Sequence, residues 1–114
     1  MGKPTESKNN YAEGDLLPLI TPGQILFHEF MEPYGLSMNS LAKNLNISPT
    51  AVSEIVRGER SITTLTAIRL SLCFDTTPQF WTNLQQQHDI EEAMRESLDK
   101  LQKEVTRVKD LVVH

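Results

Sequence analysis

The stretch that decides the fold is SMNSLAKNLNISPTAVSEIVR, residues 37–57. Its apolar residues recur at spacings of three and four, the period of a helix that buries one face. Serine, a preferred N-cap, precedes each of two such runs, at Ser37 and at Ser48-Pro49. Asn46 separates the runs, and Gly58 follows the second; both residue types accept the left-handed backbone conformation. The stretch therefore predicts two short helices joined by a tight turn.

The side chains expected to face inward from these two helices have sizes that allow the helices to cross at a steep angle. Ala42 is expected at the closest approach, because a larger side chain there would push the helices apart. Larger aliphatic residues would fill the rest of the angle between the helices: Leu41, Leu45, Ile47, Val52 and Ile55. This spacing is typical of a helix-turn-helix unit.

The second predicted helix directs a polar face outward. In a helix-turn-helix unit, the N-terminal end of this helix is the part that meets a DNA major groove. Thr50, Ser53 and Glu54 are therefore predicted to contact base edges, where glutamate can accept a hydrogen bond from cytosine. The predicted DNA-binding set is completed by Pro49 on the same face and by three residues suited to phosphates: Asn39, Lys43 and Arg57.

Further helix signals flank this unit. Thr21-Pro22-Gly23-Gln24 has the pattern of a capping box and predicts a helix that runs to about Glu32. Thr63 predicts a helix through about Phe74, and Thr77-Pro78 predicts the start of another. No segment alternates apolar and polar residues as a half-buried strand does. We expect an all-α domain of five helices over residues 20–88, preceded by a flexible leader over residues 1–19.

Residues 89–114 carry a different pattern, in which apolar residues recur every three or four positions between charges. The pattern predicts an amphipathic C-terminal helix as an extension of the domain. Three interpretations are open: the helix folds back onto the domain, forms a dimer contact, or orders only on a partner. The residues of the stripe are Ile90, Met94, Leu98, Leu101, Val105, Val108 and Val112. The fifth helix adds candidate core or dimer-contact residues at Phe80, Trp81 and Leu84.

Charge is distributed unevenly along the 114-residue chain. Its formal net charge of −4 disfavours DNA binding if it is taken as a whole. Residues 37–70, however, hold four bases against two acids, whereas the segment from Asp89 onward holds seven acids against five bases. A DNA-binding surface is therefore expected in the middle of the chain, and the acidic end would suit a basic partner.

The other chemistry-bearing residues predict neither catalysis nor a metal or cofactor site. The histidines show no ligand spacing, and Cys73 lies in an apolar helix without a base placed to activate it. Gly23, Gly35 and Gly58 are expected to punctuate helices, not to form a phosphate-binding loop. The lone cysteine and the absence of an apolar span favour a cytoplasmic protein without a membrane segment.

Three ordered blocks of the sequence resemble the HigA/VapI-type antitoxins, a branch of the phage-repressor-like (XRE) helix-turn-helix regulators. The blocks are TPGQILFHEFMEPYGLS (21–37), LAKNLNISPTAVSEIVRGERSIT (41–63) and TAIRLSLCFDTTPQFWTNLQ (66–85). The chain departs from this family at the turn, where Asn46 stands in place of the usual glycine, and in its continuation to His114 beyond the fifth helix.

The resemblance implies a five-helix lambda-repressor-like domain that dimerises and binds a palindromic operator in its own promoter. It also implies a HigB-type, mRNA-cleaving toxin as protein partner. A competing interpretation is an interaction module of the same fold that lacks strong DNA binding, either neutralising a toxin or serving as an orphan regulator. The net negative charge and the presence of Glu54 on the expected reading face motivate that alternative.

Overall fold

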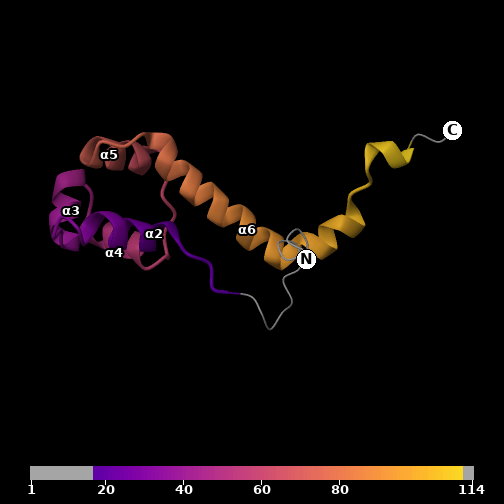
Figure 1. Cartoon of the computed structure of the whole chain (residues 1–114), viewed down its shortest axis with the longest axis horizontal. Coiled ribbons are helices and arrows are strands. Elements are labelled where there is room, and N and C mark those ends of the chain that lie inside the picture. Colours follow the sequence, from indigo (N-terminus) through magenta and orange to yellow (C-terminus); the bar gives the residue numbers. More distant parts are fainter. Residues whose placement is uncertain (1–16, 112–114) are drawn as a thin grey trace, which may run out of the picture.

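The computed structural model of the chain describes residues 17–111, and this part is all-α, without a strand. Figure 1 shows the short helices gathered into a bundle, from which one long helix projects. The first helix changes from α to π geometry partway along, so that α2 runs directly into η2. The elements are α2 (Pro22–Ile25), η2 (Leu26–Met31), α3 (Met38–Leu45), α4 (Pro49–Val56), α5 (Thr64–Phe74), α6 (Pro78–Glu104) and the 3-10 turn η3 (Val108–Leu111). The predicted five-helix fold is confirmed.

Every predicted helix start is confirmed by a hydroxyl side chain that accepts a backbone N–H of the first turn. At α2 the capping box is complete, with Gln24 N donating to Thr21 Oγ1 at 3.1 Å and Thr21 N donating to Gln24 Oε1 at 2.8 Å. These contacts satisfy amide groups that have no partner inside the helix, which fixes where each helix begins. The other N-caps are Ser37, Ser48, Thr63 and Thr77.

The two predicted left-handed positions are also confirmed. Asn46 ends α3 with φ of 58°, and Gly58 follows α4 with φ of 79°. After α4 the chain doubles back through two bonds, from Gly58 N to the carbonyl of Ile55 at 3.0 Å and from Glu59 N to the carbonyl of Glu54 at 2.8 Å. This is a Schellman turn, which satisfies the last carbonyls of a helix. It returns residues 59 and 60 towards the last turn of α4.

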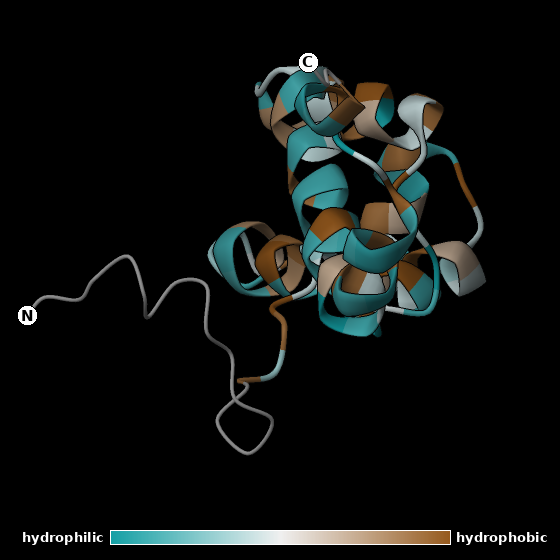
Figure 2. Cartoon of the chain, turned by 90° about the vertical axis from the view of Figure 1, so that its right-hand side faces the viewer, coloured by the Kyte–Doolittle hydropathy of each residue, from teal (hydrophilic) through white to brown (hydrophobic). Residues whose placement is uncertain are grey.

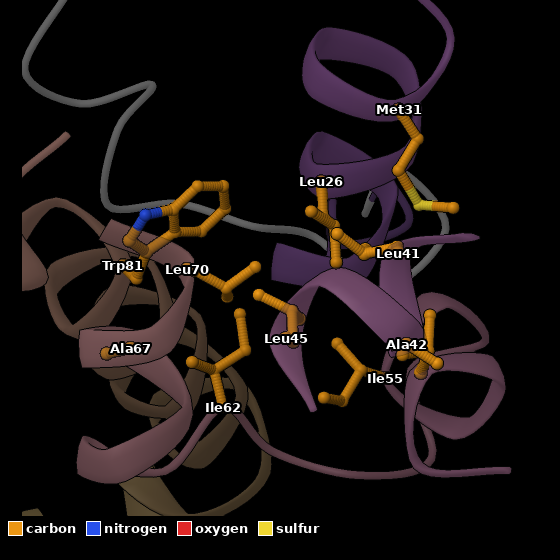
Figure 3. Packing of buried hydrophobic residues seen from close by; sticks show 11 residues of the cluster. Leu26, Met31, Leu41, Ala42, Leu45, Ile55, Ile62, Ala67, Leu70 and Trp81 are labelled. Atoms are coloured by element: carbon orange, nitrogen blue, oxygen red, sulfur yellow. The ribbon is translucent and has the colours of Figure 1, made fainter. Parts of the chain in front are cut away.

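One hydrophobic core joins all the helices of the bundle (Figure 3). Trp81 at the base of α6 is fully buried, and its Nε1–H donates to Thr76 Oγ1 at 2.7 Å. The ring of Phe30 lies 4.8 Å from that of Trp81, measured between centroids. A buried indole N–H usually finds an acceptor, since an unmade hydrogen bond there would cost free energy, and Thr76 supplies it. The other buried apolar residues are Leu26, Met31, Leu41, Ala42, Leu45, Val52, Ile55, Ile62, Ala67 and Leu70.

Gly23 does more than mark the start of a helix, the only role that its sequence context predicts. A Cβ atom at this position would lie 1.9 Å from the carbonyl oxygen of Ile55, far inside van der Waals contact. The backbones of α2 and α4 therefore meet at Gly23, where only a residue without a side chain fits. This contact lets α4 pack directly against α2.

The long helix α6 differs from the two separate elements that the sequence predicts. The predicted boundary between residues 88 and 89 falls inside it, and the helix ends at Glu104, short of residue 114. It projects from the bundle (Figure 1), and the described structure measures 61 Å along its longest axis. Among residues 17–111, no helix has the length and apolar character needed to cross a bilayer.

The interpretation that the C-terminal helix folds back onto the domain is wrong. The stripe residues Ile90, Met94 and Leu101 are 53%, 49% and 46% exposed. Viewed from the C-terminal side, the ribbon shows apolar and polar residues interspersed along the helices (Figure 2). The periodicity correctly predicted a helix, but these three stripe residues remain about half exposed, and only Leu98 of the stripe within α6 is partly buried. Val112 and most of the expected leader, residues 1–16, lie outside the described residues.

Candidate nucleic-acid interface

The outer face of α4 is the candidate interface. Val52 and Ile55 are buried beneath it, whereas Pro49 and Thr50 are exposed and Ser53 is partly exposed. Residues three and four positions apart share a side of a helix, so Pro49, Thr50 and Ser53 form a polar, accessible face of α4, while Val52 and Ile55 form its buried apolar face. The predicted base-reading residues thus lie on one surface that a major groove can approach.

The preceding helix, α3, supplies two of the three residues expected to contact phosphates. Asn39 and Lys43 are four positions apart and both exposed, so they lie on the same side of α3. The turn that joins α3 to α4 is closed by a bond from Ile47 N to the carbonyl of Ala42 at 3.0 Å. Ala42 is 1% exposed, as expected of a residue at a close helix crossing. None of the seven predicted DNA-binding residues is buried.

Arg57 is held at the end of α4 by two neighbours. Its guanidinium donates to Ser53 Oγ through Nη1, and to the carboxylate of Glu59 through Nε at 3.2 Å and Nη2 at 2.9 Å. The hydrogen bond and charge of Glu59 raise the pKa of Arg57, and Arg57 in turn lowers the pKa of Glu59. Both groups are therefore charged at neutral pH, and a phosphate would compete with Glu59 for the same guanidinium.

A second ion pair crosses the same surface. Arg60 donates through Nε at 2.8 Å and through Nη2 at 2.5 Å to a single oxygen, Oε1 of Glu54. Neither Arg60 nor Glu59 is among the site residues that the sequence predicts. The signal that could have found them is Gly58, since a Schellman turn after α4 brings the residues that follow it back over the last turn of that helix.

One of the bases counted in the middle of the chain has a structural role. Arg69 Nη1 donates at 2.9 Å to the carbonyl of Leu45, at the end of α3. This bond ties α5 to the helix-turn-helix unit and satisfies a carbonyl that has no acceptor role inside α3. Arg69 is therefore not counted among the groups available to DNA.

The three residues named as possible dimer contacts differ in accessibility. Trp81 is completely buried within its own chain, so its assignment as a dimer contact is wrong; the core of the bundle encloses it. Phe80 is 38% exposed and meets Trp81 edge to face, with centroids 5.0 Å apart. Leu84 is partly buried against the core.

Two further groups carry side chains suited to catalysis or to metal binding. Cys73 is half-buried, and burial raises the pKa of its thiol, which keeps it protonated and poorly nucleophilic at neutral pH. His88, Asp89 and Glu92 bring three donor atoms within 4.8 Å of one another on one side of α6. Residues on one turn of an exposed acidic helix meet in this way without an ion, and Gln85 already donates to Asp89 at 3.0 Å.

Comparison with known proteins places the chain in a family. Residues 27–81 match the helix-turn-helix family model. Virulence-associated protein I of Dichelobacter nodosus is 46% identical over 68% of this chain and 71% of its own. An antidote protein of the HigA family from Coxiella burnetii is 46% identical, with a TM-score of 0.76 over 80% of this chain and 99% of its own.

A further solved structure was determined with DNA present. Antitoxin HigA of Pseudomonas aeruginosa, described with the higBA promoter, is 36% identical, with a TM-score of 0.77 over 80% of this chain and 99% of its own. These similarities extend over the bundle and into α6, at identities that go beyond a shared fold. The chain belongs to the HigA/VapI-type branch of the XRE helix-turn-helix family.

Proposed function

We propose that the chain is a transcriptional repressor of the antitoxin type, which binds double-stranded operator DNA of its own promoter with α4 in the major groove. The observation that carries this proposal is the exposed polar face of α4. The opposite, apolar face of the same helix is buried, and the small residues Gly23 and Ala42 let it pack closely against the bundle. The relative from Pseudomonas aeruginosa described with the higBA promoter supports it.

The active form is a homodimer that binds a palindromic site. Two-fold symmetry sets two copies of α4 about 34 Å apart, one turn of DNA, so that each reads one half-site. The outer part of α6 offers the apolar surface for association through Ile90, Met94 and Leu101, all about half exposed. Phe80 and Leu84, nearer the bundle, are secondary candidates for the same contact.

The second partner is a HigB-type toxin. Between Asp89 and Glu104, α6 carries six acids against three bases, a surface suited to a basic protein. A short basic open reading frame beside the gene would identify this partner, and its absence would favour an orphan regulator. The proposed roles are those of a cytoplasmic binding protein without enzymatic activity.

A gel-shift titration against the chain's own upstream DNA, at two salt concentrations, tests the repressor function. Wild-type protein is expected to bind tightly and more weakly as salt rises, since phosphate contacts release counterions. Arg57→Ala is expected to weaken binding to all sequences alike and to reduce the salt slope by about 1. Thr50→Ala is expected to alter the preference at one base pair of each half-site, by about 1–3 kcal/mol.

Circular dichroism and sedimentation control for folding and dimerisation. If a folded wild-type dimer does not bind this DNA at low salt, the repressor proposal is wrong, and the chain acts as an interaction module. If both variants unfold, α4 does not have the exposed polar face described above, and the assigned surface is wrong.

A further inference from the structure

The pairing of Glu54 with Arg60 resolves a contradiction at the candidate interface. A carboxylate on a surface that approaches DNA is repelled by phosphates, and Glu54 lies on such a surface. In this structure its charge is matched by the guanidinium of Arg60, which binds it through two N–H groups. The pair is neutral overall, so α4 can approach DNA without an excess negative charge.

The two carboxylate oxygens of Glu54 differ in their hydrogen bonds. Both Arg60 donors converge on Oε1, at 2.8 Å and 2.5 Å. Among residues 17–111, none donates a hydrogen bond to the other oxygen, Oε2. The Glu54 side chain is 30% exposed and that of Arg60 is 51% exposed, so the pair lies at the surface of the protein.

We infer that Arg60 is a positioning residue that fixes Glu54 as an acceptor for one exocyclic amino group in the major groove, with cytosine the preferred base. This inference rests on the proposed repressor function. A carboxylate oxygen can only accept, and at a given strand position cytosine presents an N4 amino donor where guanine presents only the acceptors N7 and O6. The held carboxylate therefore favours C·G over G·C at that position.

The two arginines next to α4 then have different tasks. Arg57 is ion-paired with Glu59 beyond the end of α4 and also donates to Ser53 Oγ; it can exchange the carboxylate of Glu59 for a phosphate. Arg60 is paired with a residue of the reading face itself. Removing Arg57 should change affinity for all sequences, whereas removing Arg60 should change which sequence is preferred.

Glu54→Gln provides the sharpest variant, because an amide has one acceptor and one donor. Arg60 would hold the amide oxygen and leave the NH₂ group as the outward donor. The preference should then move from cytosine to a base that presents acceptors, guanine above all. Without Arg60 the amide group can rotate by 180°, which exchanges its oxygen and its NH₂ group. The double variant Glu54→Gln with Arg60→Ala should therefore show no shift of preference from cytosine to guanine.

The experiment is selection from a library of randomised duplexes, followed by titration of all four bases at each position of the selected site. Wild type is expected to prefer cytosine at one position per half-site by roughly tenfold, within the usual range for one base contact. Arg60→Ala should reduce that preference to about twofold or less and leave the other positions unchanged. Arg60→Lys, which keeps the charge but lacks the planar fork, should restore part of it.

The outcomes separate the inference from the function on which it rests. If Arg60→Ala lowers affinity equally for all four bases and keeps the preference for cytosine, Arg60 contacts phosphate and the inference is wrong. An unchanged preference in Glu54→Gln overturns it as well, and does so without relying on the folding of any Arg60 variant. If wild type selects no sequence at all, the proposed repressor function itself fails. Arg57→Ala serves as the matched control, and its preference for cytosine at the position read by Glu54 should equal that of wild type.

Discussion

The inner and outer parts of α6 belong to one uninterrupted helix but lie in different surroundings. At the inner end Trp81 is fully buried, packed against Phe30 and hydrogen-bonded to Thr76. At the outer end Leu101 is 46% exposed, although it occupies a stripe with the same helical period. Helix formation depends on local propensity and capping, whereas burial depends on what else the fold brings near. Periodicity therefore predicts the helix and not the element that covers it.

Substitution of one large residue in each part should give the largest contrast. Trp81→Ala is expected to lower the free energy of unfolding by about 3–5 kcal/mol, because it leaves a cavity and an unpaired Thr76 hydroxyl. Leu101→Ala should change it by no more than about 0.5 kcal/mol in the monomer. Urea unfolding of dilute protein measures both values, with sedimentation to show that the sample is monomeric. Equal losses would mean that the outer part of α6 is packed against its own chain.

Disrupting the close contact between α2 and α4 at Gly23 should give the next largest loss of stability. Gly23→Ala should destabilise the fold by about 3 kcal/mol, since its Cβ would meet the carbonyl oxygen of Ile55. Gly35→Ala is the matched control, because Gly35 has φ of 65° but a Cβ added there would meet no atom within 4 Å; its cost is backbone strain alone, about 1–2 kcal/mol. Thermal unfolding compares the two. A smaller loss for Gly23→Ala than for Gly35→Ala would contradict the close contact of α2 with α4.

Removal of the outer part of α6 should cost less stability than either Trp81→Ala or Gly23→Ala. A chain that ends at His88 keeps the buried core residues of the bundle, all of which lie between Leu26 and Trp81. We expect cooperative unfolding with a midpoint shifted by no more than about 5 °C, which corresponds to roughly 1 kcal/mol for a domain of this size. Differential scanning calorimetry measures the shift. A truncated chain without a cooperative transition would show that the domain proposed for residues 20–88 requires the rest of α6.

The features that sequence predicted well are those decided within a few residues. The N-caps at Thr21 and Ser37 depend on a hydroxyl and an amide three positions away, and Asn46 terminates α3 through its own backbone preference. The all-α fold and the outward polar face of α4 follow from these signals together with the helical period. The family resemblance gave the same fold and is confirmed by comparison.

The features that sequence missed depend on chain segments meeting in space. Nothing near Trp81 in the sequence says that Phe30 packs against it, so core and dimer contact were both plausible. Gly23 faces Ile55 across two helices, and the partner of Glu54 is six positions away, beyond a chain reversal. The boundary placed after residue 88 does not interrupt the helix. Asp89 is an N-cap residue type, but its carboxylate accepts from Gln85 Nε2, and no proline or glycine stands there to break α6.

The continuity of α6 has a consequence for how such a protein can change over generations. Substitutions near Trp81 are constrained by a core that every helix of the bundle shares. Around Met94 and Leu101, by contrast, a substitution leaves that core untouched. If the proposed partner binds the far end of α6, a lineage can exchange that partner while it inherits α4 unchanged, so that partner choice and operator choice evolve independently.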